Sequence, residues 1–259
     1  MILSQTMKRI YNKKAIRYNK RYIGAMGKYF RKLEWDIVLN FGNFSGRYIL
    51  DVGTGTGEFL LKISDVSKMA IGIEVSARMM DIAKSKLKDK KNITLFLMDL
   101  RELGFKDCSF DIVTSIGTFE CFSYLSHCLK EIKRVLKPDG LLIFTYWNAD
   151  QWLNWKVLNH RRLKGSSSRS MDDLDKELKE NGFEPQGYTT SFFTPGILLF
   201  GLSKILAIEM FRRIYIDILI RIEKKLQNLP ITRDRGRVLI VSAKVTEQNQ
   251  RLYSLNVRR

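Results

Sequence analysis

The sequence predicts an α/β fold in which a mostly parallel sheet of seven strands carries helices on both faces. Three observations support this prediction. Short runs of continuously apolar residues recur along the chain, stretches with helical apolar spacing separate them, and a glycine-rich loop directly follows the first run. Strands buried on both faces of a parallel sheet are apolar throughout, whereas half-exposed strands alternate. The succession of strand and helix is typical of such a layered domain.

Residues 1–47 are expected to form a basic, helical N-terminal cap. Apolar residues recur with helical spacing over residues 7–40, among many lysines and arginines. Residues 42–46 contain glycine, asparagine and serine, which end this pattern. The apolar run 48–52 then predicts the first strand, and the loop that follows it holds three glycines.

Residues 48–195 are expected to form the core of the domain. Helical spacing predicts helices after the glycine loop and over 77–87, 125–136 and 171–181. Residues 137–140, Lys-Pro-Asp-Gly, are expected to form the turn that ends the third of these helices. The apolar runs predict strands over 48–52, 70–74, 93–98, 110–116, 141–147, 183–193 and 237–245.

Residues 196–235 are expected to be an amphipathic helical insertion before the last strand, and residues 236–259 hold that strand and a basic tail of the same domain. At about 100° per residue, one apolar stripe of the insertion is predicted. It consists of Ile208, Phe211, Tyr215, Ile218, Leu219 and Ile222. Three alternatives follow: residues 196–228 lie in a membrane interface, pack over the sheet or acceptor pocket, or bind a partner.

The net charge of +18 is concentrated at the two ends of the chain. Residues 1–47 hold eleven Lys/Arg and two Asp/Glu, and residues 196–259 hold thirteen and five, whereas residues 48–195 are nearly neutral. Basic ends of this kind favour an anionic surface, either lipid headgroups or nucleic acid. The alternative is a solvated, lysine-rich surface.

The remaining composition restricts the compartment and the chemistry. Three cysteines and two histidines do not provide a disulfide framework or a metal site, so no metal is expected. The N-terminus has no apolar signal core, and no run reaches eighteen uncharged apolar residues. The expected location is the cytoplasm, with peripheral contact at the membrane as the alternative. The oligomeric state does not follow from the sequence.

Acidic residues stand at the ends of three predicted strands. Asp51 precedes the glycine loop, and Glu74 and Asp99 end the second and third strands. Because the carboxyl ends of parallel strands meet at one edge, these acids are expected to line one crevice. The loop spaces its last two glycines more closely than the dinucleotide fingerprint does, and Asp51 would repel a pyrophosphate. The site therefore suits an ammonium group, a ribose at Glu74 and an adenine amino group at Asp99.

These motifs resemble those of the class I S-adenosylmethionine (SAM)-dependent methyltransferases. Residues 49–57 resemble motif I of that family, residues 72–80 its second motif, and Asp99-Leu100 its adenine-contacting pair. Residues 110–113 and 129–142 resemble the fourth strand and the helix, turn and strand after it, with Asp139 where a second glycine is usual. The resemblance implies a Rossmann-like fold, SAM as cofactor, and methyl transfer by in-line displacement.

The resemblance also implies which residues bind the cofactor. In the N-terminal helix, Tyr11-Asn12 and Tyr18-Asn19 resemble the Tyr/Phe-Asp pairs of small-molecule and quinone methyltransferases, with Asn in place of Asp. The implied cofactor-binding residues are Tyr18, Asp51, Gly53, Thr54, Gly55, Gly57, Glu74, Val75, Met79, Asp99, Leu100 and Ser115.

The resemblance does not identify the methyl acceptor. Glu120, Tyr146 and His160 are the candidate catalytic residues, with Tyr188 as a fourth, because each could act as a general base near the mouth of the crevice. We expect methyl transfer to oxygen or carbon of a small-molecule or lipid-like acceptor. The alternatives are an RNA or protein methyltransferase that docks through its basic ends, and a catalytically silent adaptor with the same fold.

Overall fold

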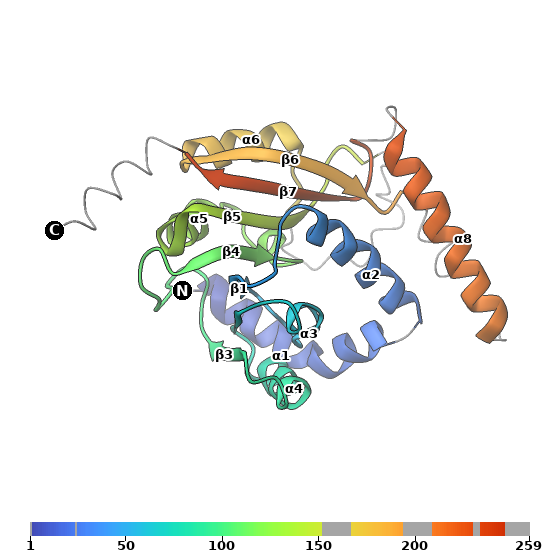
Figure 1. Ribbon diagram of the computed structural model, residues 1–259, viewed down its shortest axis with the longest axis horizontal. Helices are drawn as coiled ribbons and strands as arrows, with labels where there is room; N and C mark the ends of the chain where they lie inside the picture. The colour runs from blue at the N-terminus through green and yellow to red at the C-terminus, as the bar shows by residue number, and fades with distance from the viewer. Residues whose placement is uncertain (1, 24, 152–166, 194–208, 230–233, 247–259) are drawn as a thin grey trace.

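The computed structural model describes residues 2–23, 25–151, 167–193, 209–229 and 234–246. A seven-stranded sheet with the order β3-β2-β1-β4-β5-β7-β6 forms its centre (Figure 1). Strands β1 to β5 are parallel to one another, and β7 is antiparallel to both β5 and β6. The strands are β1 (Tyr48–Val52), β2 (Met69–Glu74), β3 (Ile93–Leu97), β4 (Phe110–Ser115), β5 (Leu136–Trp147), β6 (Phe183–Ser191) and β7 (Val238–Val245). The predicted Rossmann-like α/β fold is confirmed.

Helices cover both faces of the sheet (Figure 1). One core contains the inward residues of α5 and α6, such as Leu129 and Leu174, and the other contains those of α2, α3 and α8, such as Leu33, Leu60 and Leu219. The helices are α1 (Ile2–Ile23), α2 (Ala25–Asn40), α3 (Glu58–Ile63), α4 (Ala77–Leu87), the 3-10 turn η1 (Phe119–Cys121), α5 (Ser126–Val135), α6 (Met171–Glu180) and α8 (Glu209–Asn228).

The helical structure predicted over residues 7–40 is confirmed, and it consists of two helices. Helix α1 ends at Ile23 and α2 begins at Ala25, with a glycine between them in the sequence. Glycine is unfavourable in a helix interior, but the spacing of the apolar residues continues on both sides of it and so does not indicate where one helix ends and the next begins. Helix α1 packs against α4 and α2, which brings it beside the second strand–helix unit of the sheet.

The turn predicted at residues 137–140 is wrong, because these residues lie within β5. Phe110 of β4 pairs with Leu136, and Ile112 pairs with Leu141, so the register shifts between these pairs. Lys137 donates a hydrogen bond to Asp111 of β4 at 2.9 Å. The turn-forming residues mark a bulge in the strand instead of a helix–strand connection.

Helix α8 presents a different face from the one predicted. Leu219 is buried and Tyr215 packs on the core, as the stripe requires, but Ile218 and Ile222 are exposed. The carboxylate of Glu223 takes an inward position, where it accepts a hydrogen bond from Phe193 N at 2.9 Å. Residue 208 lies outside the described residues. In the described parts of the chain, no helix is long and apolar enough to cross a membrane.

Candidate functional site

The glycine loop after β1 is held in place by the neighbouring strand. The backbone N–H groups of Gly53 and Thr54 both donate to Ile73 O of β2, each at 2.9 Å. Gly53, Gly55 and Gly57 have φ values of +73°, +57° and +77°, which side chains with a Cβ rarely adopt. The loop therefore depends on glycine for its backbone conformation at three positions.

The three glycines differ in what surrounds them. A Cβ on Gly53 would lie 2.0 Å from Thr118 Oγ1, and one on Gly57 would lie 2.8 Å from Leu87 Cδ1. A Cβ on Gly55 would meet nothing closer than Met79 Sδ at 3.8 Å. Gly53 and Gly57 thus allow close packing within the protein, whereas bare main chain at Gly55 borders open space.

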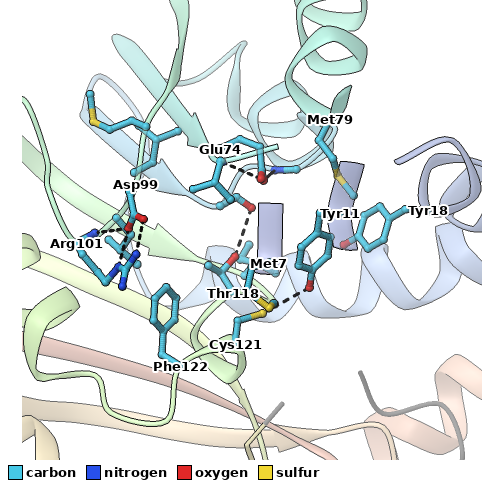
Figure 2. Close-up of a pocket in the computed structure, with 18 residues that line it drawn as sticks. Met7, Tyr11, Tyr18, Glu74, Met79, Asp99, Arg101, Thr118, Cys121 and Phe122 are labelled. Atoms are coloured by element: carbon cyan, nitrogen blue, oxygen red, sulfur yellow. Dashed lines mark hydrogen bonds and ion pairs between the residues drawn. The ribbon is translucent and has the colours of Figure 1, made fainter. Parts of the chain in front are cut away.

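That space is a cavity of about 750 Å³, open to solvent, at the carboxyl ends of β1 to β4. Figure 2 shows Asp99 and Arg101 at one end, Tyr11 and Tyr18 of α1 at the other, and Glu74 between them. Eight of the predicted cofactor-binding residues line it: Tyr18, Gly53, Gly55, Glu74, Val75, Met79, Asp99 and Leu100.

Four predicted cofactor-binding residues lie behind the wall of the cavity. Asp51 is only 2% exposed, and its Oδ1 accepts a hydrogen bond from Thr114 Oγ1 at 2.7 Å. Burial raises the pKa of Asp51. Thr54, Gly57 and Ser115 also do not line the cavity, so none of these four residues is placed to touch a ligand there directly.

Glu74 braces the glycine loop from β2. Its Oε2 accepts a hydrogen bond from Gly55 N at 3.0 Å, and its Oε1 accepts from Val75 N and Ser76 N, both at 2.9 Å. Burial raises the pKa of Glu74, and the three backbone hydrogen bonds oppose that rise. A carboxylate accepts about four hydrogen bonds, so Glu74 keeps capacity for a ligand hydroxyl.

Asp99 forms an ion pair that sequence reasoning missed. Arg101 donates from Nε to Asp99 Oδ1 at 3.0 Å and from Nη2 to Oδ2 at 2.7 Å. Arg101 also lines the cavity. The end of β3 therefore offers a carboxylate and a guanidinium together, where only an acceptor for an amino group was expected. The sequence does not indicate that two side chains of a loop, two residues apart, will form such an ion pair.

Glu120 is the predicted catalytic residue with the most perturbed environment. It does not line the cavity itself, but its Oε1 lies 3.7 Å from where a Cβ would stand on the lining residue Gly117. Its Oε2 is buried and accepts no hydrogen bond from the part of the chain that the structure describes. Burial raises the pKa of Glu120 to about 7, the negative charge of Glu34 adds to the rise, and the positive charge of Arg31 opposes it. A carboxyl group with a pKa near neutrality can accept and return a proton at physiological pH.

The other catalytic candidates are placed differently. The Tyr146 hydroxyl shares a hydrogen bond with Ser167 and donates to Phe122 O at 3.3 Å, and Tyr146 does not line the cavity. Its expected place at the mouth of the crevice is wrong, because β5 points this side chain into the core. Tyr188 of β6 packs against the same core. His160 lies outside the described residues.

Two further groups near the cavity were not predicted. Arg31 of α2 donates to the Tyr18 hydroxyl at 2.7 Å and to Glu34 Oε2 at 3.0 Å, so it links the cavity wall to a second acid. The Tyr11 hydroxyl lies 3.5 Å from Cys121 Sγ, and both residues line the cavity. Burial raises the pKa of Cys121 to about 12, so the thiol is neutral. These contacts join α1, α2 and η1, and no local sequence pattern predicts that these three elements meet.

Comparison with known proteins shows what this part of the chain is similar to. Residues 50–144, which span the glycine loop, Glu74, Asp99 and Glu120, match a family model described as a methyltransferase domain. An uncharacterized protein of Methanocaldococcus jannaschii, MJ1252, is 32% identical over 181 residues, 66% of this chain and 65% of that protein. A demethylmenaquinone methyltransferase of Lactococcus lactis is 41% identical over 108 residues, 39% of this chain and 42% of that enzyme.

The chain thus spans less than two thirds of each of these relatives. Among solved structures, a SAM-dependent methyltransferase of Thermotoga maritima, titled a possible histamine N-methyltransferase, superposes with a TM-score of 0.65 at 18% identity. The superposition covers 92% of this chain and 99% of that one. At that identity the likeness concerns the fold, and it extends well beyond the residues that match the family model.

Proposed function

We propose that the chain is a class I SAM-dependent methyltransferase and that it methylates an oxygen or carbon atom of a small-molecule or lipid-like acceptor. SAM is the cofactor of this family. The observation that carries the proposal is the open main chain at Gly55, directly beside the carboxylate of Glu74. A nucleoside can approach bare backbone there while its ribose hydroxyls reach the remaining acceptor capacity of Glu74.

The charges around the cavity fit a cationic cofactor. Burial raises the pKa of both Asp51 and Glu74, so each carboxylate lacks solvation that an adjacent positive charge would replace. We assign the ammonium group to the side near Asp51, the ribose to Glu74, and the adenine to the end with Asp99 and Leu100. Val75 and Met79 supply apolar surface for the rings between these groups.

Bound SAM supplies a methyl group on a sulfonium, which a nucleophile displaces in line. The protein's task is to orient the acceptor and exclude water. We propose that Glu120 Oε2 accepts a hydrogen bond from an acceptor hydroxyl and takes its proton as the new bond to carbon forms. Its pKa of about 7 suits that exchange with solvent after product release.

A lipid-like acceptor is supported by apolar residues in the wall of the cavity. Met7, Ile116 and Phe122 line the cavity and offer apolar surface. The demethylmenaquinone methyltransferase of Lactococcus lactis, which matches 39% of this chain, is named for a quinone acceptor. We extend the class of that acceptor, an apolar ring compound, to this protein as a proposal.

Transfer of a radiolabelled methyl group tests the proposal. The full chain is incubated with methyl-labelled SAM and a cell lysate, and the label is partitioned between lipid, RNA, protein and small-molecule fractions. We expect label in the lipid or small-molecule fraction, and none with Glu74→Ala. Label in RNA would replace this proposal with methylation of nucleic acid through the basic ends. A failure of SAM to raise the melting temperature would refute SAM binding itself.

A further inference from the structure

Helix α8 stands at the edge of the molecule (Figure 1), and none of its residues lines the cavity. Its inner face is anchored: Leu219 and Glu223 are buried, and Tyr215 and Ile220 pack on the core. Gln227 Nε2 donates a hydrogen bond to Thr189 Oγ1 of β6 at 3.1 Å, which holds the C-terminal end of the helix. These internal contacts fix the orientation of α8, and they therefore also fix which of its residues face outward.

The outer face carries three isoleucines that contact no core. Ile214, Ile218 and Ile222 are 50%, 49% and 42% exposed. At a spacing of four residues they lie on one side of the helix, one above the other. We call these three residues the isoleucine row. Single exposed apolar residues are ordinary, but three in register on one helix form a continuous apolar strip.

Positive charges flank the isoleucine row. Arg221, Lys224 and Lys225 are all exposed, against a single exposed acid, Asp217, between Ile214 and Leu229. The outer face thus combines apolar and cationic groups, as helices that lie flat in a membrane interface do. An apolar strip beside cations complements a lipid surface, in which anionic headgroups cover an apolar interior.

We propose that the isoleucine row, with its flanking cations, docks this protein on an anionic lipid surface. A second copy of the chain fits less well, because pairing two such helices would bring their cations together. A nucleic acid would match the cations but would leave the isoleucines in water. An anionic lipid surface matches both the isoleucines and the cations. No described helix is suited to span a membrane, so we propose docking at the surface.

The docking surface is separate from the proposed active site. Helix α8 packs on α2 and β6, and none of its residues lines the cavity. The two proposals can therefore fail independently: SAM binding is measured by thermal shift, and docking by sedimentation with vesicles. A lipid-like acceptor would explain why a methyltransferase docks on lipid, but docking itself does not rest on the proposed acceptor.

Vesicle sedimentation of the full chain tests the proposal. The probes are vesicles of pure phosphatidylcholine, and the same vesicles with about one third phosphatidylglycerol. The test variant is Ile214→Ser/Ile218→Ser/Ile222→Ser. The matched control is Val66→Ser/Leu97→Ser, because these residues are 49% and 54% exposed but lie near β2 and β3, at the other edge of the sheet.

We expect wild type and control to bind anionic vesicles at least about tenfold more tightly than neutral ones, and the test variant to lose this binding. All three proteins should show the same thermal shift with SAM, which establishes that the variants are folded. Equal binding of wild type to both vesicles, or anionic binding that survives in the test variant, would overturn the proposal. So would concentration-dependent dimerisation that the test variant abolishes, because the row would then cover a second copy.

Discussion

Replacing Gly55 by alanine separates the role of the glycine loop in binding from its role in folding. A Cβ at this position would lie in the cavity, with Met79 Sδ as its nearest neighbour at 3.8 Å. The protein itself therefore has room for the new methyl group, but a nucleoside on the bare main chain does not. Gly55→Ala should fold and should lose affinity for SAM.

The cost to stability can be isolated with a matched variant. Gly46 has a φ of +68°, close to the +57° of Gly55, and a Cβ there would meet nothing within 4 Å. An alanine in this left-handed conformation costs about 1–2 kcal/mol, which corresponds to a melting temperature lower by roughly 2–8 °C. Gly46→Ala and Gly55→Ala should both show this decrease without cofactor.

The two variants should diverge when SAM is added. At a concentration about 100 times the dissociation constant, SAM stabilises the wild type by about 2.7 kcal/mol, and a tenfold loss of affinity reduces this to about 1.4 kcal/mol. We expect the full stabilisation in Gly46→Ala and at most half of it in Gly55→Ala, measured by differential scanning fluorimetry and calorimetric titration. Wild-type affinity in Gly55→Ala would show that no ligand lies on this main chain, and the assignment of the cavity would be wrong.

Three further predictions concern the charged groups. Glu74→Gln should weaken SAM binding at least about tenfold in calorimetric titration, because an amide donor would face Gly55 N–H and the ribose would lose an anionic acceptor. In folded protein the pKa of Glu120 is raised to about 7, so its charged form costs stability increasingly as the pH rises from about 4.5 through 7. Glu120→Gln should thus melt higher than wild type at pH 8 but not at pH 4, and transfer to a hydroxyl acceptor should be lost; equal melting differences at both pH values would contradict the burial of this charge. Arg31→Leu should move the alkaline rise of the transfer rate to higher pH, since Arg31 opposes the increase in the pKa of Glu120, whereas Arg31→Lys should restore it; an unchanged pH profile in Arg31→Leu would exclude that coupling.

Residues whose roles depend on neighbours along the chain could be predicted from the sequence. Glu74 ends β2, Asp99 lies two residues after the end of β3, and Gly53 and Gly55 follow β1, so parallel pairing alone brings them to one edge of the sheet. Apolar runs likewise predicted β1, β2, β4, β5 and β7, because these strands are mostly buried, whereas β3 and β6 lie at the edges of the sheet and keep exposed residues. The error at residues 137–140 is of a different kind: turn residues show that regular pairing is interrupted, but not which elements lie on either side.

Residues whose roles depend on distant contacts could not be predicted. Arg31 reaches Tyr18 from another helix, and the hydroxyl of Tyr146 meets Ser167, which lies 21 residues further along the chain. The face of α8 was predicted wrongly because a buried acid, Glu223, occupies a position that a hydrophobicity pattern assigns to the outside. In each case a polar contact across the tertiary structure outweighed the local pattern, and such contacts leave no periodic signal.

The same contacts restrict the charge of the acceptor. Glu120 is buried beside the acid Glu34, and Arg31 is the cation that opposes them while also acting on Asp51. Two like charges about 4 Å apart repel by about 4 kcal/mol at the effective dielectric of a partly buried site. An acceptor that placed a phosphate or carboxylate next to Glu120 would add an anion where acids already predominate, whereas a neutral hydroxyl would donate to Oε2 and relieve its missing hydrogen bond. Neutral hydroxyl compounds should therefore compete with the natural acceptor in the labelling assay, and their phosphate esters should not; competition by the esters alone would mean that the acceptor binds away from Glu120.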